Sequence, residues 1–506
     1  MTAVQPAPSG AEQPAPPPPP APPARRRTTG LRRRPPGTPP AGAARLLPRT
    51  VAARIRTLTA VALVLLVALL AIAWASIANA REGIRVIGHD AGPQVVATGD
   101  LYFQLSDMDA QLANALLAGG AAGGGDRDQA LARYNDNRLK AGDALLKAAR
   151  LADERTEENT ARDVLDALGR YERLAGQALL LDRQSGRASG PPSEEVIGLY
   201  RQATDLMKLD LLPKAYNLTL DNGTLVRHTY EDERSAVLTG RTWILVTGAA
   251  LLATLAGAQL YLARRFRRLL NVPLALATLA ALVLVAAGTA MLSGQADHLR
   301  QAKEDGFDSI LSLARARAIS NSASADETRF LLDPDRADAY EQVYLSKSQT
   351  VLYLPAGNLT EYNEAVQKDL SFEPGRAHFL GFLGTEANRP TDSAARQAQL
   401  VEALNKALSD YQKVQANDRR MRDLVHSGKR TEAIAARGAA TGDFAEYDRS
   451  LQGLIGLHQK VFDEAVRDGD DGTAGWYAVL PAAGAGIALL VLLGVRPRLA
   501  EYRWSK

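Results

Sequence analysis

The sequence predicts an all-α membrane protein with four transmembrane helices and two extracytoplasmic helical bundles that arose by internal duplication. Three observations in the 506 residues lead to this fold class. Four uncharged apolar stretches exceed 20 residues, basic residues concentrate in the short segments that flank them, and the remainder has helical periodicity without sustained β alternation. Cysteine is absent, which excludes a disulfide framework, Cys-ligated metals and thiol nucleophiles.

The chain begins with a segment, 1–56, that we predict to be a disordered cytoplasmic leader. Fifteen of the 26 prolines lie in 1–50, and such a composition buries too little apolar surface to fold. Its arginine clusters are candidate contacts for anionic lipid or for an acidic face of a cytoplasmic protein. Charge that only sets the topology is the open alternative. The clusters are Arg25, Arg26, Arg27 and Arg32, Arg33, Arg34.

Four transmembrane helices are predicted at 57–80, 242–263, 269–293 and 475–495. Each stretch is long enough to cross a hydrocarbon core about 30 Å thick, because an α-helix rises about 1.5 Å per residue. None contains Asp, Glu, Lys, Arg or His. Because a transport path usually retains ionisable groups inside the membrane, the spans are interpreted as anchors and not as a transporter core.

The charge distribution predicts the orientation. Segments 1–56, 264–268 and 496–506 contain 18 basic and two acidic residues, whereas the rest of the chain contains 42 basic and 54 acidic residues. By the positive-inside rule, both termini and the turn at 264–268 are cytoplasmic in a multi-pass plasma-membrane protein, and segments 81–241 and 294–474 lie outside. The turn supplies further candidate partner or lipid contacts, namely Arg264, Arg265, Arg267 and Arg268.

An internal repeat relates the two halves of the chain. The first span of each half begins near residue 57 or 272, an offset of about 215, and the same offset places Leu116-Leu117 on Leu331-Leu332. In both outer segments apolar residues recur at helical spacings of three and four. We therefore expect four to five helices in each outer segment.

Turn residues predict where these helices end. Breaks are expected at 186–192, 221–223, 388–390 and 468–475. Gly92-Pro93 should also interrupt the chain beyond the first span, because proline lacks a backbone donor. Residues 295–332 contain no proline, so the third span should continue outward as one rod.

No catalytic or metal-binding constellation is found. The chain lacks a phosphate-binding loop, HExxH, GxSxG and kinase signatures, and its six histidines are scattered. Acid-rich stretches at 153–158 and 231–233 are interpreted as solvated helix faces. We expect a protein that is not an enzyme, with no cofactor, no metal and no nucleic-acid partner.

A sequence resemblance concerns 325–334, which reads Ala-Asp-Glu-Thr-Arg-Phe-Leu-Leu-Asp-Pro and precedes Tyr340-Glu341. It resembles the first helical hairpin of the four-helix-bundle sensor domains of bacterial chemoreceptors and histidine kinases, in which an acidic-hydroxyl pair precedes a Leu-Leu turn. Two such bundles on four spans, without an output domain, are similar in arrangement to the actinobacterial GlnX family of membrane signalling proteins. No functional residue can be carried over from it.

That resemblance implies a non-enzymatic coupling role. Amino-acid availability outside, sensed through a solute-binding lipoprotein, would be relayed to a cytoplasmic Ser/Thr kinase. Two alternatives stay open, a cell-envelope scaffold and an accessory membrane subunit of a transporter. A homodimer is a further possibility that the sequence leaves open.

Overall fold

The computed structural model describes residues 51–120, 125–151, 155–266, 271–368, 370–374, 378–390 and 393–501. These residues are almost entirely helical and form no β-strand, apart from one isolated bridge between Tyr353 and Leu380. The first half consists of α1 (Val51–Ile84), η1 (Arg85–Ala91), α2 (Gly92–Ala118), α3 (Gly125–Leu151), α4 (Arg155–Ser185), α5 (Glu194–Leu206), η2 (Met207–Leu211) and α6 (Leu212–Phe266).

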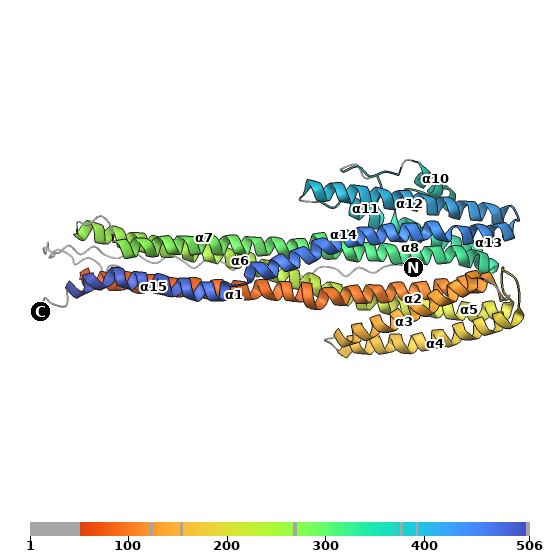
Figure 1. Cartoon of the computed structure of the whole chain (residues 1–506), viewed down its shortest axis with the longest axis horizontal. Helices are drawn as coiled ribbons and strands as arrows, with labels where there is room; N and C mark the ends of the chain where they lie inside the picture. Colours follow the sequence, from red (N-terminus) through yellow and green to blue (C-terminus); the bar gives the residue numbers. More distant parts are fainter. Residues whose placement is uncertain are drawn as a thin grey trace, which may run out of the picture. The chain divides into compact units, whose positions relative to one another are not determined.

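The second half has the same all-helical character (Figure 1). Its elements are α7 (Val272–Arg300), η3 (Gln301–Phe307), α8 (Asp308–Leu332), η4 (Pro334–Arg336), α9 (Ala337–Val351), α10 (Leu359–Gln367), α11 (Gly381–Ala387), α12 (Ala394–His426), α13 (Arg430–Ala439), α14 (Thr441–Thr473) and α15 (Trp476–Glu501). The elements η1, η2 and η3 are π-helical, and η4 is a 3₁₀ turn.

Four helices of the described residues are long and apolar enough to cross a membrane, as predicted. The predicted spans correspond to α1, α6, α7 and α15, with Asn271 and Gly475 just before α7 and α15; residues 269 and 270 are outside the described residues. Helix α15 is separated from α14 by Gly475, whose φ of +81° is a conformation that favours glycine. The predicted joint at 468–475 is therefore confirmed at its C-terminal end.

The spans contact one another through small and weakly polar groups. Asn271 donates to the carbonyl of Gly494 at 2.7 Å, and Gln259 donates to the hydroxyl of Thr278 at 2.8 Å. Hydrogen bonds of this kind hold helices together in lipid, where apolar side chains gain nothing by leaving the hydrocarbon. Packing of the spans against one another therefore explains why Asn271 and Gln259 are present in them.

Three helices continue without a break from a span into the region outside it. They are α1–η1–α2, α6 preceded by α5 and η2, and α7–η3–α8, each with one π-helical segment. The rod predicted for 295–332 is present, with η3 inserted in it. Segments η1 and η3 begin 216 residues apart, counted from Arg85 to Gln301, which is close to the offset of the predicted repeat.

Two predicted interruptions are wrong. Helix α2 begins at Gly92 and includes Pro93, directly after the π-helical turn of η1. A wider π turn makes room where a proline lacks its donor and would otherwise collide with the preceding turn. The break at 221–223 is also absent, because α6 is continuous there; Leu218 and Val226 are buried on either side, and their burial outweighs a glycine cost of about 1 kcal/mol.

The two halves share a hydrophobic core outside the spans. Helix α2 packs along α8, and the core built by α2 to α6 includes Phe330, Leu331, Leu332 and Tyr340 of the second half. A second core belongs to the second half alone and is formed by α8, α9, α10, α11, α12 and α14. Helix α8 therefore contributes to both cores.

Helix α14 approaches η3 closely at Gly306. A Cβ at Gly306 would lie 2.8 Å from Cβ and 3.0 Å from Cα of Phe462, which are atoms that cannot rotate away. We expect Gly306→Ala to lower the free energy of unfolding by about 1–3 kcal/mol, as overpacking does. Thermal unfolding of the full chain would measure this.

Gly294→Ala, in the same continuous helix, is the matched control, because the nearest atom to its Cβ would be 3.9 Å away. That variant should be neutral or slightly stabilising, since alanine favours helix. Equal melting temperatures for the two variants would contradict the close approach.

Candidate functional site

A cluster of charged side chains with a buried centre joins the halves, and we call it the α8 hub. It comprises Asp109 on α2, Lys208 in η2, Asp326 and Arg329 on α8, and Lys347 on α9. Asp109, Asp326 and Arg329 are 1%, 0% and 2% exposed. Charges so deeply buried are costly unless each is paired and hydrogen-bonded, so the partners decide what the hub can do.

Arg329 is the central cation of the α8 hub. Its guanidinium donates to Asp109 at 2.5 Å, to the hydroxyl of Tyr200 at 3.0 Å, and to Asp326 one helical turn earlier. Asp109 and Tyr200 belong to the first half, whereas Arg329 and Asp326 belong to the second. One side chain therefore ties α8 to α2 and α5.

Asp326 receives three cations. Lys347 donates to one carboxylate oxygen and Arg329 to the other, which also lies 3.2 Å from the ammonium of Lys208. Burial by itself would raise the pKa of the Asp326 carboxyl, but these cations outweigh burial and hold the pKa well below its ordinary range. Asp326 is therefore a stable anion between α8, α9 and η2.

Asp109 is satisfied from its own half as well. The hydroxyl of Thr204 donates to it at 2.6 Å and that of Tyr171 at 3.3 Å. Burial and the neighbouring Asp109 raise the pKa of Tyr171 well above its ordinary value, so this phenol remains a donor. Hydrogen bonds within the first half therefore hold the carboxylate of Asp109 in position to bind Arg329.

Two further contacts extend the junction along α8. The hydroxyl of Thr328 donates to Asn114 at 2.8 Å. Beyond the helix end, Arg201 of α5 binds both oxygens of Asp333 at 2.9 and 2.6 Å. Bidentate pairing fixes both position and orientation. The Asp333-Pro334 turn is therefore clamped to the first half, and is more than a local turn.

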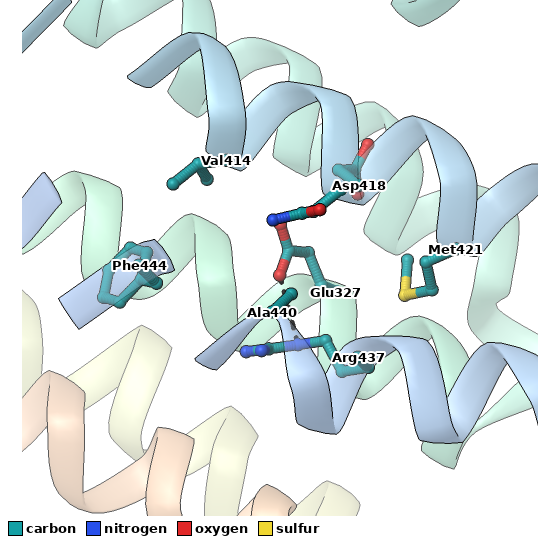
Figure 2. Close-up of a pocket in the computed structure, with 8 residues that line it drawn as sticks. Glu327, Val414, Asp418, Met421, Arg437, Ala440 and Phe444 are labelled. Carbon is teal, nitrogen blue, oxygen red and sulfur yellow. Dashed lines mark ion pairs between the residues drawn. The ribbon is translucent and has the colours of Figure 1, made fainter. Parts of the chain in front are cut away.

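Glu327 faces a different set of helices from that of its neighbour Asp326. Figure 2 shows Glu327 between α12, which carries Asp418, and α13, which carries Arg437. The carboxylate forms an ion pair with Arg437 at 3.1 Å. Burial raises the pKa of Glu327 to about 7, with the nearby Asp418 also raising it and Arg437 opposing.

The space beside Glu327 is too small for an organic ligand. Its cavity measures about 10 Å³, which is near the minimum for a single water. A neighbouring cavity, also lined by Glu327, is of the same size. The cavities beside Glu327 therefore offer no room for a substrate.

The predicted contact residues are far from this hub in the sequence. Arg25, Arg26, Arg27, Arg32, Arg33, Arg34, Arg267 and Arg268 lie outside the described residues. Arg264 and Arg265 lie in the last turn of α6, and the side chain of Arg264 is exposed. Neither residue is part of the α8 hub, and the prediction that they contact a partner or lipid stays a prediction.

Sequence reasoning misses the α8 hub, although it singles out 325–334. It predicts hairpin packing there and assigns the charges no partners. One usable signal is present: Asp326 and Arg329 are three residues apart beside the apolar run 330–332. The other partners, Asp109 and Lys208, give no local signal, because their contacts with α8 span 220 and 118 residues.

The described residues define an α-helical multi-pass membrane protein whose helices outside the spans meet at a buried ionic junction. Residues 83–231 match the family model described as an actinobacterial sensor domain. The match lies in the first half, whereas the resemblance found in the sequence is carried by the second. A sensor domain indicates a signalling role. No curated protein and no solved structure matches the chain.

Proposed function

We propose that the chain is a non-enzymatic transmembrane signal-coupling protein. In this proposal the helices outside the spans lie on the extracytoplasmic side, both termini are cytoplasmic, and a change in outer packing reaches a cytoplasmic partner. The observation that carries the proposal is the continuity of α1–η1–α2, of α5–η2–α6 and of α7–η3–α8. The sensor-domain match at 83–231 supports the same role.

The α8 hub is the element that we propose to exist in two states. Coupling requires a stimulus with different affinity for two packings of the protein. Buried ion pairs suit this purpose, because breaking one of them leaves an uncompensated charge and intermediate arrangements are therefore unfavourable. A shift of α8 against α2 would move α7 relative to α1, because α7 continues through η3 into α8 and α1 continues through η1 into α2.

The finer proposal concerns the two ends of the relay. The resemblance to GlnX-type proteins suggests a solute-binding lipoprotein that reports amino-acid availability outside and a Ser/Thr kinase inside. In this proposal the cytoplasmic partner binds the arginine turn at 264–268, where the side chain of Arg264 is exposed. Its charge would attract an acidic partner face or anionic lipid.

Neutralising the turn should weaken partner recruitment. We expect the quadruple change Arg264→Gln, Arg265→Gln, Arg267→Gln and Arg268→Gln to reduce co-purified kinase by about tenfold or more, because electrostatic attraction is lost. Arg173→Gln, an exposed change on α4, is the control. Since arginines also set topology, accessibility labelling must first show that the spans keep their orientation. Undiminished recruitment with intact topology would remove the turn from the proposal.

The relay itself is tested by crosslinking in intact cells. A photo-crosslinking amino acid replaces exposed Arg264, and a second variant carries it at exposed Trp243, near the opposite end of the same span. Cells are compared with and without added glutamate, aspartate or glutamine. We expect capture of a kinase at position 264 and of a lipoprotein at position 243, with yields that change on addition.

Other outcomes would favour the other functions. Envelope proteins captured at yields that are indifferent to amino acids would replace the relay with a scaffold. Capture of a nucleotide-binding ATPase at position 264 would replace it with a transporter subunit.

A further inference from the structure

A cavity of about 150 Å³ lies in the second half, away from the α8 hub. Its wall is formed by η3, by the residues after α11, by the first turns of α12 and by α14. An engineered cavity of this volume binds benzene, so the space suits a small organic molecule. The charged and ionisable residues of its lining are Asp305, Arg389, Arg396, His458, Lys460 and Glu464.

Part of this lining is already engaged in holding η3. The ring of His458 contacts the backbone carbonyl of Asp305 at 2.7 Å and the carboxylate of Glu386 at 2.5 Å. Arg389 donates to the carbonyl of Glu304 at 2.6 Å. Two successive carbonyls of the π-helical segment are therefore bound by side chains of other elements, an arrangement that ties the cavity wall to η3.

Glu386, which contacts the lining residues His458 and Arg389, is an anion. Burial would raise the pKa of its carboxyl, but the hydrogen bond from His458 and the charges of His458 and Arg389 leave the pKa below its ordinary value. Its second oxygen is 3.5 Å from Nε of Arg389, too far for a good hydrogen bond. Both of these buried atoms lack a hydrogen-bond partner among the described residues.

The remaining cations of the lining are not engaged. Arg396 is half-buried on α12, and Lys460 is exposed on α14; neither forms a hydrogen bond or ion pair within the described part of the chain. A guanidinium removed from water gains most from a carboxylate, which it can bind through two parallel hydrogen bonds. Two unpaired cations at the wall of this partly open cavity therefore favour an anionic ligand.

We propose that this cavity binds a small carboxylate anion, with Arg396 and Lys460 as its main cationic contacts. Leu400, Leu457 and Val461 supply apolar walls for the carbon skeleton. A ligand here would contact the wall held to η3, and η3 continues α7 from the third span. The inference thus deepens the proposed function. A signalling role for the ligand rests on that function, whereas binding of the ligand to the cavity does not depend on any relay.

Binding is tested by titration calorimetry on the purified full chain in lipid nanodiscs. The probes are succinate, which carries carboxylates only, and L-glutamate, which adds an ammonium; 1,5-diaminopentane is the cationic control. We expect saturable binding of at least one anion and none of the diamine. Succinate and glutamate of equal affinity would identify the carboxylate as sufficient, and tighter binding of glutamate would indicate a contact of its ammonium with the acidic residues of the lining, Asp305 and Glu464.

Two variants decide whether the cavity is the site. Arg396→Gln and Lys460→Gln should each weaken anion binding by about tenfold or more, the loss expected when a charged partner is removed, while Arg173→Gln on α4 should leave it unchanged. Neither Arg396 nor Lys460 has a hydrogen-bond or ion-pair partner among the described residues. Both variants should therefore have the melting temperature of the wild type, which a thermal scan verifies. Absence of binding to either anion at millimolar concentration would overturn the proposal, as would binding unaffected by Arg396→Gln. Failure of the relay with intact binding would leave the site standing.

Discussion

Arg329→Met should lower the free energy of unfolding of the full chain by about 3–5 kcal/mol, the range for breaking a buried ion pair by removing one partner. Methionine keeps much of the volume but removes the donors to Asp109, Asp326 and Tyr200. Asp109 would then be a buried carboxylate without its cation. The loss would appear as a large drop in melting temperature in detergent or nanodiscs.

A double variant separates loss of the ion pair from loss of packing. Asp109→Asn together with Arg329→Met removes both charges, and the amide oxygen introduced at position 109 could still accept from Thr204 and Tyr171. We expect the double variant to recover at least half of the loss, because the stranded charge is gone. Arg162→Met is the exposed control; its pairing with Glu158 should contribute less than about 1 kcal/mol.

If the double variant is no more stable than Arg329→Met, the stability of the junction comes from packing. The two-state role proposed for the α8 hub would then lose its physical basis. The shared core formed by Phe330, Leu331 and Leu332 would become the element to test instead.

Glu327 should make the stability of the protein depend on pH. Its pKa of about 7 in the folded chain exceeds the value of about 4.3 expected when it is unfolded. Between these two values the folded state holds a proton that the unfolded state has lost, so stability from this group decreases as the pH rises. It is fully present below about pH 4.3 and lost once the pH passes about 7.

Comparison with Glu327→Gln isolates this contribution, because the amide stays uncharged throughout. The stability of the wild type relative to the variant should fall by roughly 2–3 kcal/mol between about pH 5 and pH 8, since one pKa unit corresponds to about 1.4 kcal/mol. Melting temperatures of both proteins at several pH values across this range measure the difference. The charged groups facing Glu327 are Arg437 from α13 and Asp418 and Arg422 from α12.

Glu158→Gln serves as the control for this titration, because Glu158 is an exposed carboxylate on α4. Its difference from the wild type should not change over the same range. A constant difference for Glu327→Gln as well would show that Glu327 is ionised at all these pH values. A Glu327 that is protonated near pH 5 in the folded chain would then be excluded.

Much of the fold could be predicted from the sequence, because the determining information is local. A charge-free apolar run of more than about 20 residues can only be buried in lipid or in a large core, and all four such runs proved to be helices able to span a membrane. Turn residues likewise located the connections at 186–192 and 388–390, where a helix ends and another begins.

Local signals failed where tertiary packing outweighed them. At 221–223 the burial of flanking side chains keeps α6 continuous, and at Pro93 a π-helical turn absorbs the missing donor. Propensities of about 1 kcal/mol decide a helix boundary only when no larger packing energy opposes them.

The α8 hub shows the same division more strongly. In the sequence, Asp326 and Arg329 are three residues apart beside the apolar run 330–332, but the charges of a solvated helix face follow the same helical spacing. Whether Asp326 and Arg329 are buried depends on which helices cover α8. Asp109 and Arg329 are 220 residues apart and meet only because α2 packs along α8. Composition and periodicity therefore determined the helices and their spans, while tertiary packing decided which charges left water and which partners they found there.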